Sequence, residues 1–405
     1  MNAPADLISR AKEIGAQLRE QQDESDARGC YSDAIHQRLL DGGFYRILQP
    51  RMFGGYGSDC ETYIRVIMEL SRGHPSSGWC YTLASSHALL LGAHFPEVVQ
   101  RELFGPTGDF RCAYAAAPAG RPTLERSGAG YLVSGMWAFA SGIPVCTHFM
   151  GGAMIAGADG VPSTIMFVVP RTSIEVLSDW GGDAAMGMQA SGSNSVRLTR
   201  VFIPDAHIVR SPIGLLSTQS LPDGTPGTRL HREGLFLGII FGWFSCEFGA
   251  ILTGAARAAL EEYERILTTK PMLFDPTRKR MHDPDLQRLL GEAMCRTDAA
   301  EALTLQATRL YSQQNEAWMK EGQAISAADT LRVWGIAREG CRAACEAVEM
   351  LFHSAGASVA KRAERLQRYF RDVQMYRIHI QSQPMAPMLR AQFRLGVDVP
   401  PAFRQ

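Results

Sequence analysis

Two histidines far apart in the chain have the side chains best suited to acid–base chemistry. The free pKa of histidine, about 6.5, lies close to working pH, so the ring can take or give a proton during a reaction. His379 lies at helical spacing from Asp372 and Tyr376, and His87 lies in the apolar stretch that follows Cys80. The alternative is that both are core histidines, with Arg368 and Asp372 forming a surface ion pair.

Several common catalytic and nucleotide-binding motifs are missing. The chain has no GxGxxG that opens a helix after a strand, no GxxxxGK[ST], no HExxH and no GxSxG. This disfavours a Rossmann dehydrogenase, a kinase and an α/β-hydrolase. Any electrons would have to come from a cofactor that is bound in another way.

Composition predicts a soluble cytoplasmic enzyme that binds neither nucleic acid nor membrane. The 405 residues are 46% hydrophobic, and 41 basic residues balance 41 acidic ones. The nine cysteines never form a CxxC pair, which favours reduced thiols and no metal site. Only Leu235–Ala255 resembles a membrane span, and Glu247 near its middle would cost roughly 2.5 kcal/mol in lipid. We therefore expect a buried helix there.

The spacing of apolar residues divides the chain into three parts. Residues 1–112 have helical spacing, and residues 113–212 hold short runs separated by Gly, Pro and Asp, which predict a β domain. Residues 213–405 predict a four-helix bundle, with helices at roughly Leu235–Leu267, Asp283–Gln313, Ser326–Ser354 and Arg362–Gln383. The expected fold class is mainly α with a central β domain.

This order of domains resembles the acyl-CoA dehydrogenase superfamily. Leu40-x-Gly-Gly43 followed by Gly54-Gly55 is similar to an N-terminal loop of that family. Gly187–Asn194 followed by Val201–Pro204 resembles its strand pair that closes the β domain. The resemblance implies an N-terminal helical domain, a β-barrel and a C-terminal four-helix bundle.

The segment Ser134–Gly142 resembles the strand that lies against the flavin in this superfamily. The resemblance implies that Phe139 packs on the isoalloxazine ring and that the Ser141 hydroxyl hydrogen-bonds flavin N5. From the residues alone, the alternative is an ordinary strand with one buried phenylalanine and one serine in a turn.

Two branches of the superfamily differ in the C-terminal helical segment. The position that matches the proton-abstracting glutamate of acyl-CoA dehydrogenases is Ile380, which cannot take a proton. The segment instead resembles two-component flavin monooxygenases, with matches at Leu366, Arg368, Arg371, Asp372 and His379. Trp79 with His87 eight residues later resembles that branch's tryptophan and active-site histidine.

The segment Phe352–Ser358 resembles the turn that contacts a neighbouring subunit's flavin in the superfamily's tetramers. The resemblance thus implies a homotetramer with Ser354, Gly356 and Ser358 near the neighbour's cofactor. Together with Phe139, Ser141 and Trp79, these are the expected cofactor-binding residues, and the expected catalytic residues are His379, His87 and Ser141.

The function implied is that of an oxygenase component. It would take reduced FMN or FAD from a separate NAD(P)H-dependent flavin reductase and react it with O2 to a C4a-hydroperoxyflavin. Transfer of the terminal oxygen would hydroxylate an aromatic, phenolic or indolic, substrate. The alternatives are an FAD desaturase or oxidase of the acyl-CoA dehydrogenase type, an N- or S-oxygenase on the same fold, and a catalytically silent helical scaffold.

Overall fold

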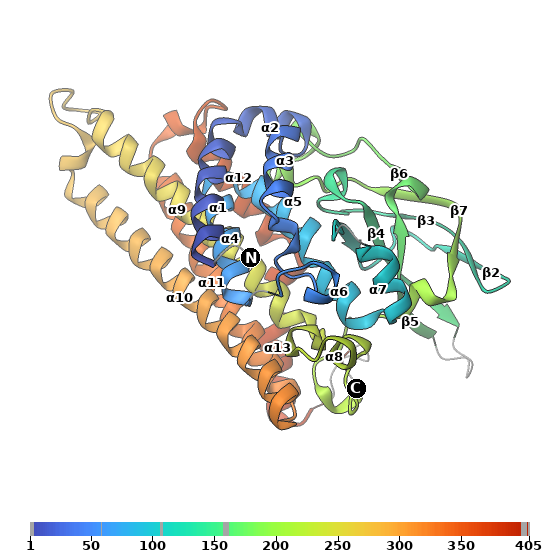
Figure 1. The fold of residues 1–405 in the computed structure, drawn as a ribbon. Helices are drawn as coiled ribbons and strands as arrows, with labels where there is room; N and C mark the ends of the chain where they lie inside the picture. The colour runs from blue at the N-terminus through green and yellow to red at the C-terminus, as the bar shows by residue number, and fades with distance from the viewer. Residues whose placement is uncertain (1–3, 58, 106–107, 157–161, 398–402, 404–405) are drawn as a thin grey trace.

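The N-terminal part is helical in the computed structural model, which describes residues 4–57, 59–105, 108–156, 162–397 and 403. Its helices lie between the β domain and the long C-terminal helices (Figure 1). Apolar residues of α1 and α4, such as Ile14 and Ile67, are fully buried at helical spacing. The helices are α1 (Pro4–Glu20), α2 (Gln22–Arg28), α3 (Asp33–Asp41), α4 (Cys60–Gly73), α5 (Pro75–Ser86), α6 (Ala88–His94) and α7 (Glu97–Phe104).

The central part forms two four-stranded sheets, in the orders β1-β4-β5-β8 and β2-β3-β7-β6. β1 runs parallel to β4, while the other paired strands are antiparallel. Trp137, Phe149 and Phe167 make edge-to-face contacts in the core of this domain. The strands are β1 (Cys112–Ala115), β2 (Thr123–Ser127), β3 (Gly130–Trp137), β4 (His148–Ala156), β5 (Pro162–Pro170), β6 (Glu175–Val176), β7 (Val196–Pro204) and β8 (Ile208–Arg210).

The C-terminal part is the expected helical bundle, and the junction of its two longest helices projects beyond the rest of the molecule (Figure 1). Its central helix packs closely on α4, because a Cβ at Gly254 would lie 2.6 Å from the carbonyl oxygen of Met68. The helices of this part are α8 (Pro226–His231), α9 (Ile240–Thr269), α10 (Pro284–Glu321), α11 (Ala327–Ser354), α12 (Arg365–Arg377) and α13 (Met385–Leu395).

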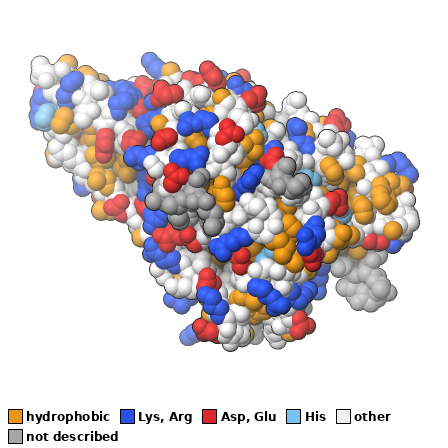
Figure 2. Space-filling model, in the orientation of Figure 1, with side chains coloured by type: hydrophobic (Ala, Val, Ile, Leu, Met, Phe, Trp, Pro, Cys, Tyr) orange, Lys and Arg blue, Asp and Glu red, His pale blue; other side chains and the backbone are white. Residues whose placement is uncertain are grey.

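The apolar segment around Glu247 is part of α9, and Glu247 is fully buried, as expected for a bundle helix. None of the described helices is long and apolar enough to cross a bilayer. On the face shown in Figure 2, basic and acidic side chains are interspersed, in keeping with the balanced composition.

Three local expectations were wrong. Gly187–Asn194 is not a strand: it contains the 3-10 turn η6 (Gln189–Ser191), and the left-handed backbone of Met188 and Gly192 on either side prevents an extended conformation. The strand β3 ends at Trp137, so Phe139 and Ser141 lie in the loop after it.

The third correction concerns the last bundle helix. α12 ends at Arg377, where the Ser382 hydroxyl donates a hydrogen bond of 2.7 Å to the Arg377 carbonyl and so satisfies one open group of the helix end. His379 therefore lies beyond α12, as the N-cap of the short 3-10 turn η12 (Ile380–Ser382), and does not share a helical face with Asp372.

Candidate active site

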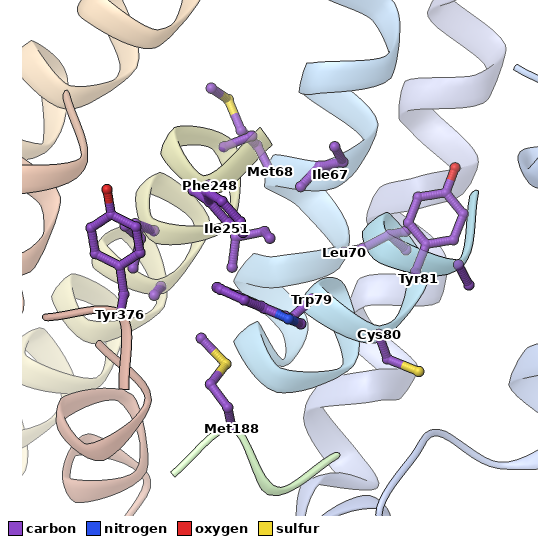
Figure 3. Packing of buried hydrophobic residues seen from close by; sticks show 14 of the residues in the cluster. Ile67, Met68, Leu70, Trp79, Cys80, Tyr81, Met188, Phe248, Ile251 and Tyr376 are labelled. Atoms are coloured by element: carbon purple, nitrogen blue, oxygen red, sulfur yellow. The ribbon is translucent and has the colours of Figure 1, made fainter. Parts of the chain in front are cut away.

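Trp79 of α5 lies at the centre of a buried aromatic cluster. Its ring stacks on Phe248 of α9, with centroids 4.7 Å apart, and meets the edge of His379 at 5.6 Å. Tyr376 completes the cluster at 5.9 Å from Phe248. Figure 3 shows Trp79 between Phe248 on one side and Met188 on the other. The cluster thus joins the N-terminal helices, α9 and the segment after α12.

A chain of hydrogen bonds leads from Trp79 into the β domain. The Trp79 Nε1–H donates to the Ser141 hydroxyl at 3.1 Å, and Ser141 Oγ lies 2.7 Å from Ser193 Oγ. Ser193 Oγ is in turn 2.7 Å from Ser191 Oγ. If each hydroxyl in the order Ser191, Ser193, Ser141 donates to the next, both lone pairs of Ser141 Oγ are occupied. The Ser141 proton is then left to donate to a bound molecule.

His379 is held neutral and in one tautomer. Burial lowers its pKa to about 4, since the apolar surroundings disfavour the charged ring. Its Nδ1 accepts the backbone N–H of Gln381 at 3.2 Å, so the ring proton resides on Nε2. At neutral pH, Nε2–H is therefore a hydrogen-bond donor.

His87, which follows α5, contacts α9 one helical turn away from Phe248. Its ring meets the edges of Phe244 at 5.9 Å and Tyr114 at 5.6 Å, and Phe244 precedes Phe248 by about 6 Å along the helix axis. The Nδ1–H of His87 donates to the Cys112 carbonyl at 2.7 Å, and burial lowers its pKa to about 4. Among the described residues, none connects His87 directly to His379 by a hydrogen bond or ring contact.

Phe139, expected to contact the flavin, has an exposed side chain. Its side chain is 68% exposed and its φ is +60°, a left-handed conformation that is costly for a phenylalanine. Its ring contact within the described part of the chain is with the edge of Trp180, with centroids 6.0 Å apart. This excludes the alternative of an ordinary buried phenylalanine and leaves an aromatic surface open to a ligand.

The end of α11 is a separate region. The Ser354 hydroxyl is occupied within the chain, donating to the Tyr263 hydroxyl at 2.9 Å. Ser358 is exposed and accepts from the Lys270 ammonium at 3.3 Å, and Gly356 has a left-handed φ of +84°. Across the described residues, no hydrogen bond, ion pair or ring contact links this end to Trp79 or Ser141.

The structure thus brings Trp79, Ser141 and His379 together, and places His87 nearby, although the sequence separates them widely. Sequence reasoning missed Phe248, Ser193 and Tyr114. Ser193 lies in a segment that had been interpreted as a strand, and Tyr114 has a buried hydroxyl without a hydrogen-bond partner among the described residues. The Gly187–Asn194 motif was the available signal for Ser193.

Comparison with known proteins agrees with this architecture. Residues 10–104 match the acyl-CoA dehydrogenase N-terminal domain and residues 246–384 match the acyl-CoA dehydrogenase C-terminal domain. A flavin-dependent monooxygenase, oxygenase subunit HsaA, from Rhodococcus jostii is 26% identical over 380 residues, 91% of this chain and 92% of its own length. The oxygenase component of an FADH2-dependent resorcinol hydroxylase from Rhizobium is 28% identical over 86% of this chain and 83% of its own length.

A solved structure of XiaF from Streptomyces, in complex with FADH2 and glycerol, superposes with a TM-score of 0.83 at 22% identity and covers 98% of this chain and 97% of its own. This similarity shows the fold. The chain belongs to the acyl-CoA dehydrogenase superfamily. Within it, the chain falls among the flavin-dependent monooxygenases, oxidoreductases that act with O2.

Proposed function

We propose that this chain is the oxygenase component of a two-component flavin monooxygenase that hydroxylates a phenolic or indolic ring. A separate NAD(P)H-dependent reductase would supply the reduced FMN or FAD. Both relatives named above are oxygenase components or subunits, which supports a division of labour between two proteins. We therefore expect the isolated chain not to oxidise NADH, since it also lacks a nicotinamide-binding motif.

The observation that carries the proposal is the hydrogen-bonded chain that ends at Ser141. Trp79 donates to the Ser141 hydroxyl oxygen, and with Ser193 donating as well, the Ser141 proton would point to a bound molecule, with the exposed ring of Phe139 two residues away. These residues fit a flavin, with Ser141 donating to N5 and Phe139 against the ring. When bound, the reduced flavin would supply the activation of O2 as a C4a-hydroperoxide, which requires that water be kept away.

The role we assign to His379 follows from its tautomer. The neutral ring presents Nε2–H, so it would donate a hydrogen bond to the oxygen of a substrate that binds as the phenolate, its proton having been released to water. A phenolate is more electron-rich than a phenol and a better nucleophile toward the transferred oxygen. His379 would thus act as a hydrogen-bond donor, and His87 with the free hydroxyl of Tyr114 would bind another part of the substrate.

The site contains little that would support acyl-CoA dehydrogenation. Among the described residues, no carboxyl group hydrogen-bonds the side chains of Trp79, Ser141 or His379. Ile380 is 60% exposed and is an apolar residue at the position of the family's catalytic base. The nearest buried acid along α9, Glu247, has a pKa raised well above its usual range by burial.

The test is an isotope-labelling assay with the purified chain. We would supply chemically reduced FMN or FAD, ¹⁸O2 and a panel of phenols and indoles, without a reductase. The expected result is a product that carries one ¹⁸O atom. Substrate consumption with no incorporated ¹⁸O, or desaturation of an acyl thioester instead, would contradict the proposal.

A further inference from the structure

Helix α12 holds the loop that carries the serine chain. This loop, Gly187–Asn194, which we call the serine loop, passes along α12 near Arg371 and Asp372. Asp372 Oδ1 accepts the backbone N–H of Met188 at 2.6 Å, and the Arg371 guanidinium donates to the Met186 carbonyl. Gly187 lies so close to the Arg371 carbonyl that a Cβ there would overlap it. Three contacts thus press the loop onto the helix.

Met188 is the residue through which this contact reaches the site. Its φ of +50° is a left-handed conformation that a methionine rarely adopts, so something must hold it. Asp372 holds its N–H, and the Trp180 Nε1–H donates to its carbonyl at 3.0 Å. Its side chain points toward the ring of Trp79 in Figure 3. Three and five residues further along the loop are Ser191 and Ser193. Ser191 hydrogen-bonds Ser193, and Ser193 hydrogen-bonds Ser141.

Apart from the Met188 N–H, the surroundings of Asp372 do little to offset the cost of burying its carboxyl group. It is fully buried, and Oδ2 hydrogen-bonds to none of the described residues. The neighbouring Arg368 is bound instead to Asp26, at 2.8 Å, and Nε2 of His74 lies 3.2 Å from the other oxygen of Asp26. Burial, followed by the charge of Asp26, raises the pKa of Asp372 to about 6. Burying an apolar side chain at this position would cost less free energy than burying an acid. The Met188 N–H is the one described group to which the Asp372 carboxyl group is hydrogen-bonded.

We propose that Asp372 is a positioning residue for the oxygen-activating site: by holding the Met188 N–H, it fixes the serine loop so that Ser193 occupies a lone pair of Ser141. This rests on the function proposed above for Ser141. Loss of Asp372 would free the loop, after which Ser193 would no longer direct the Ser141 proton outward. The site would still form, but the two electrons of the reduced flavin would reduce O2 to hydrogen peroxide, leaving oxidised flavin and unchanged substrate.

The first measurement needs no activity. Hydrogen–deuterium exchange of the full chain, without flavin, would compare wild type with Asp372→Leu, which removes the acceptor, and Asp372→Asn, which keeps one. Asp183→Asn, an exposed aspartate whose partner is Arg362, is the matched control. We expect exchange in peptides covering the serine loop to rise at least tenfold in Asp372→Leu, to stay near wild type in Asp372→Asn, and to be unchanged in β7. Wild-type exchange in Asp372→Leu overturns the proposal.

Gly187→Ala disturbs the same contact from the loop side and serves if Asp372→Leu does not fold. In the second measurement, the share of O2 released as hydrogen peroxide should rise severalfold in the variants with faster exchange. Faster exchange with an unchanged peroxide share would show that the loop is held but does not position Ser141, and would also overturn the proposal. If wild type hydroxylates no probe, the proposed function fails, while the exchange data still decide whether Asp372 holds the loop.

Discussion

The aromatic cluster around Trp79 and the end of α11 differ in how many of their contacts are made within one chain. At the centre, side chains from α5, α9, the β domain and the segment after α12 contact one another through ring packing and through the hydrogen bond from Trp79 to Ser141. At the end of α11, Ser358 is exposed and its partner is the side chain of Lys270, itself shared with Glu364. The side chains of the first region are held in place within one chain, whereas the second region is exposed to another surface.

This difference indicates what each region needs from its surroundings. A buried histidine or serine keeps one protonation state and one orientation because burial and fixed partners leave no alternative. A partly exposed lysine and an exposed serine acquire a defined role only when another surface covers them. We therefore propose that the end of α11 contributes to a flavin site across subunits of a homotetramer, and the predictions below test the contrast.

The largest expected effect is at His379. His379→Ala should slow product formation by about 10²- to 10⁴-fold, as is typical when a group that assists proton movement or charge is lost. His379→Gln, which can still donate from its side-chain amide, should recover part of this. The measurement is single-turnover hydroxylation, with the exposed His282→Ala as control. A wild-type rate in His379→Ala would make the histidine structural and transfer the role to His87.

A smaller effect is expected at Ser141. Ser141→Ala removes a donor to the flavin, which at about 0.5–1.5 kcal/mol for one hydrogen bond should lower the coupling of O2 use to product roughly two- to tenfold. It also leaves the Trp79 Nε1–H without its acceptor, which should cost about 1–3 kcal/mol of folding stability. The excess oxygen should appear as hydrogen peroxide, measured with a peroxidase assay. Ser127→Ala at the end of β2 is the control. Unchanged coupling would mean that the serine chain does not act on the flavin.

The third effect concerns stability. Burial lowers the pKa of His87 to about 4 in the folded chain, so below pH 6.5 the unfolded chain binds a proton that the folded chain does not. The contribution of neutral His87 to the free energy of unfolding is therefore fully present above pH 6.5. It falls as the pH drops toward 4, by at most about 3 kcal/mol. Denaturant unfolding between pH 4 and 7 should show a shallower decline in His87→Gln. Equal slopes would show that His87 is not held neutral.

The smallest effect should come from the open region. Lys270→Ala should raise the dissociation constant of reduced flavin by about two- to fivefold, because a partly exposed cation contributes about 0.5–1 kcal/mol. The control is Lys320→Ala, at the C-terminal end of α10, whereas Lys270 follows α9 near the N-terminal end of α10. Light scattering should give a tetramer. A monomer at micromolar concentration would remove the reason to place Ser354, Gly356 and Ser358 near a neighbour's cofactor.

Periodicity predicted the fold well because long elements with one buried face repeat their pattern many times. α9, α10 and α11 are found within a few residues of their expected positions, apart from a longer C-terminal end of α10. Short segments were predicted less well. Gly187–Asn194 has left-handed residues whose cause is the contact with α12, and α12 ends early because Ser382 caps it. Neither cause is visible in a local pattern.

The candidate site shows the same division. Trp79, Ser141 and His379 were reached through motifs, and they do meet. Phe248 was missed because one aromatic residue in a long apolar helix looks like any other core residue. The donor role of His379 depends on the Gln381 N–H, which is a property of the 3-10 turn and not of the histidine.

The most direct test of the central claim is to mix the chain with anaerobically reduced flavin against oxygenated buffer in a stopped-flow spectrometer. The account predicts the absorbance of a flavin–oxygen adduct that forms before oxidised flavin, persists in the absence of substrate and decays faster when an aromatic substrate is added. Direct conversion of reduced to oxidised flavin at the rate of free flavin, with no intermediate phase, would contradict it.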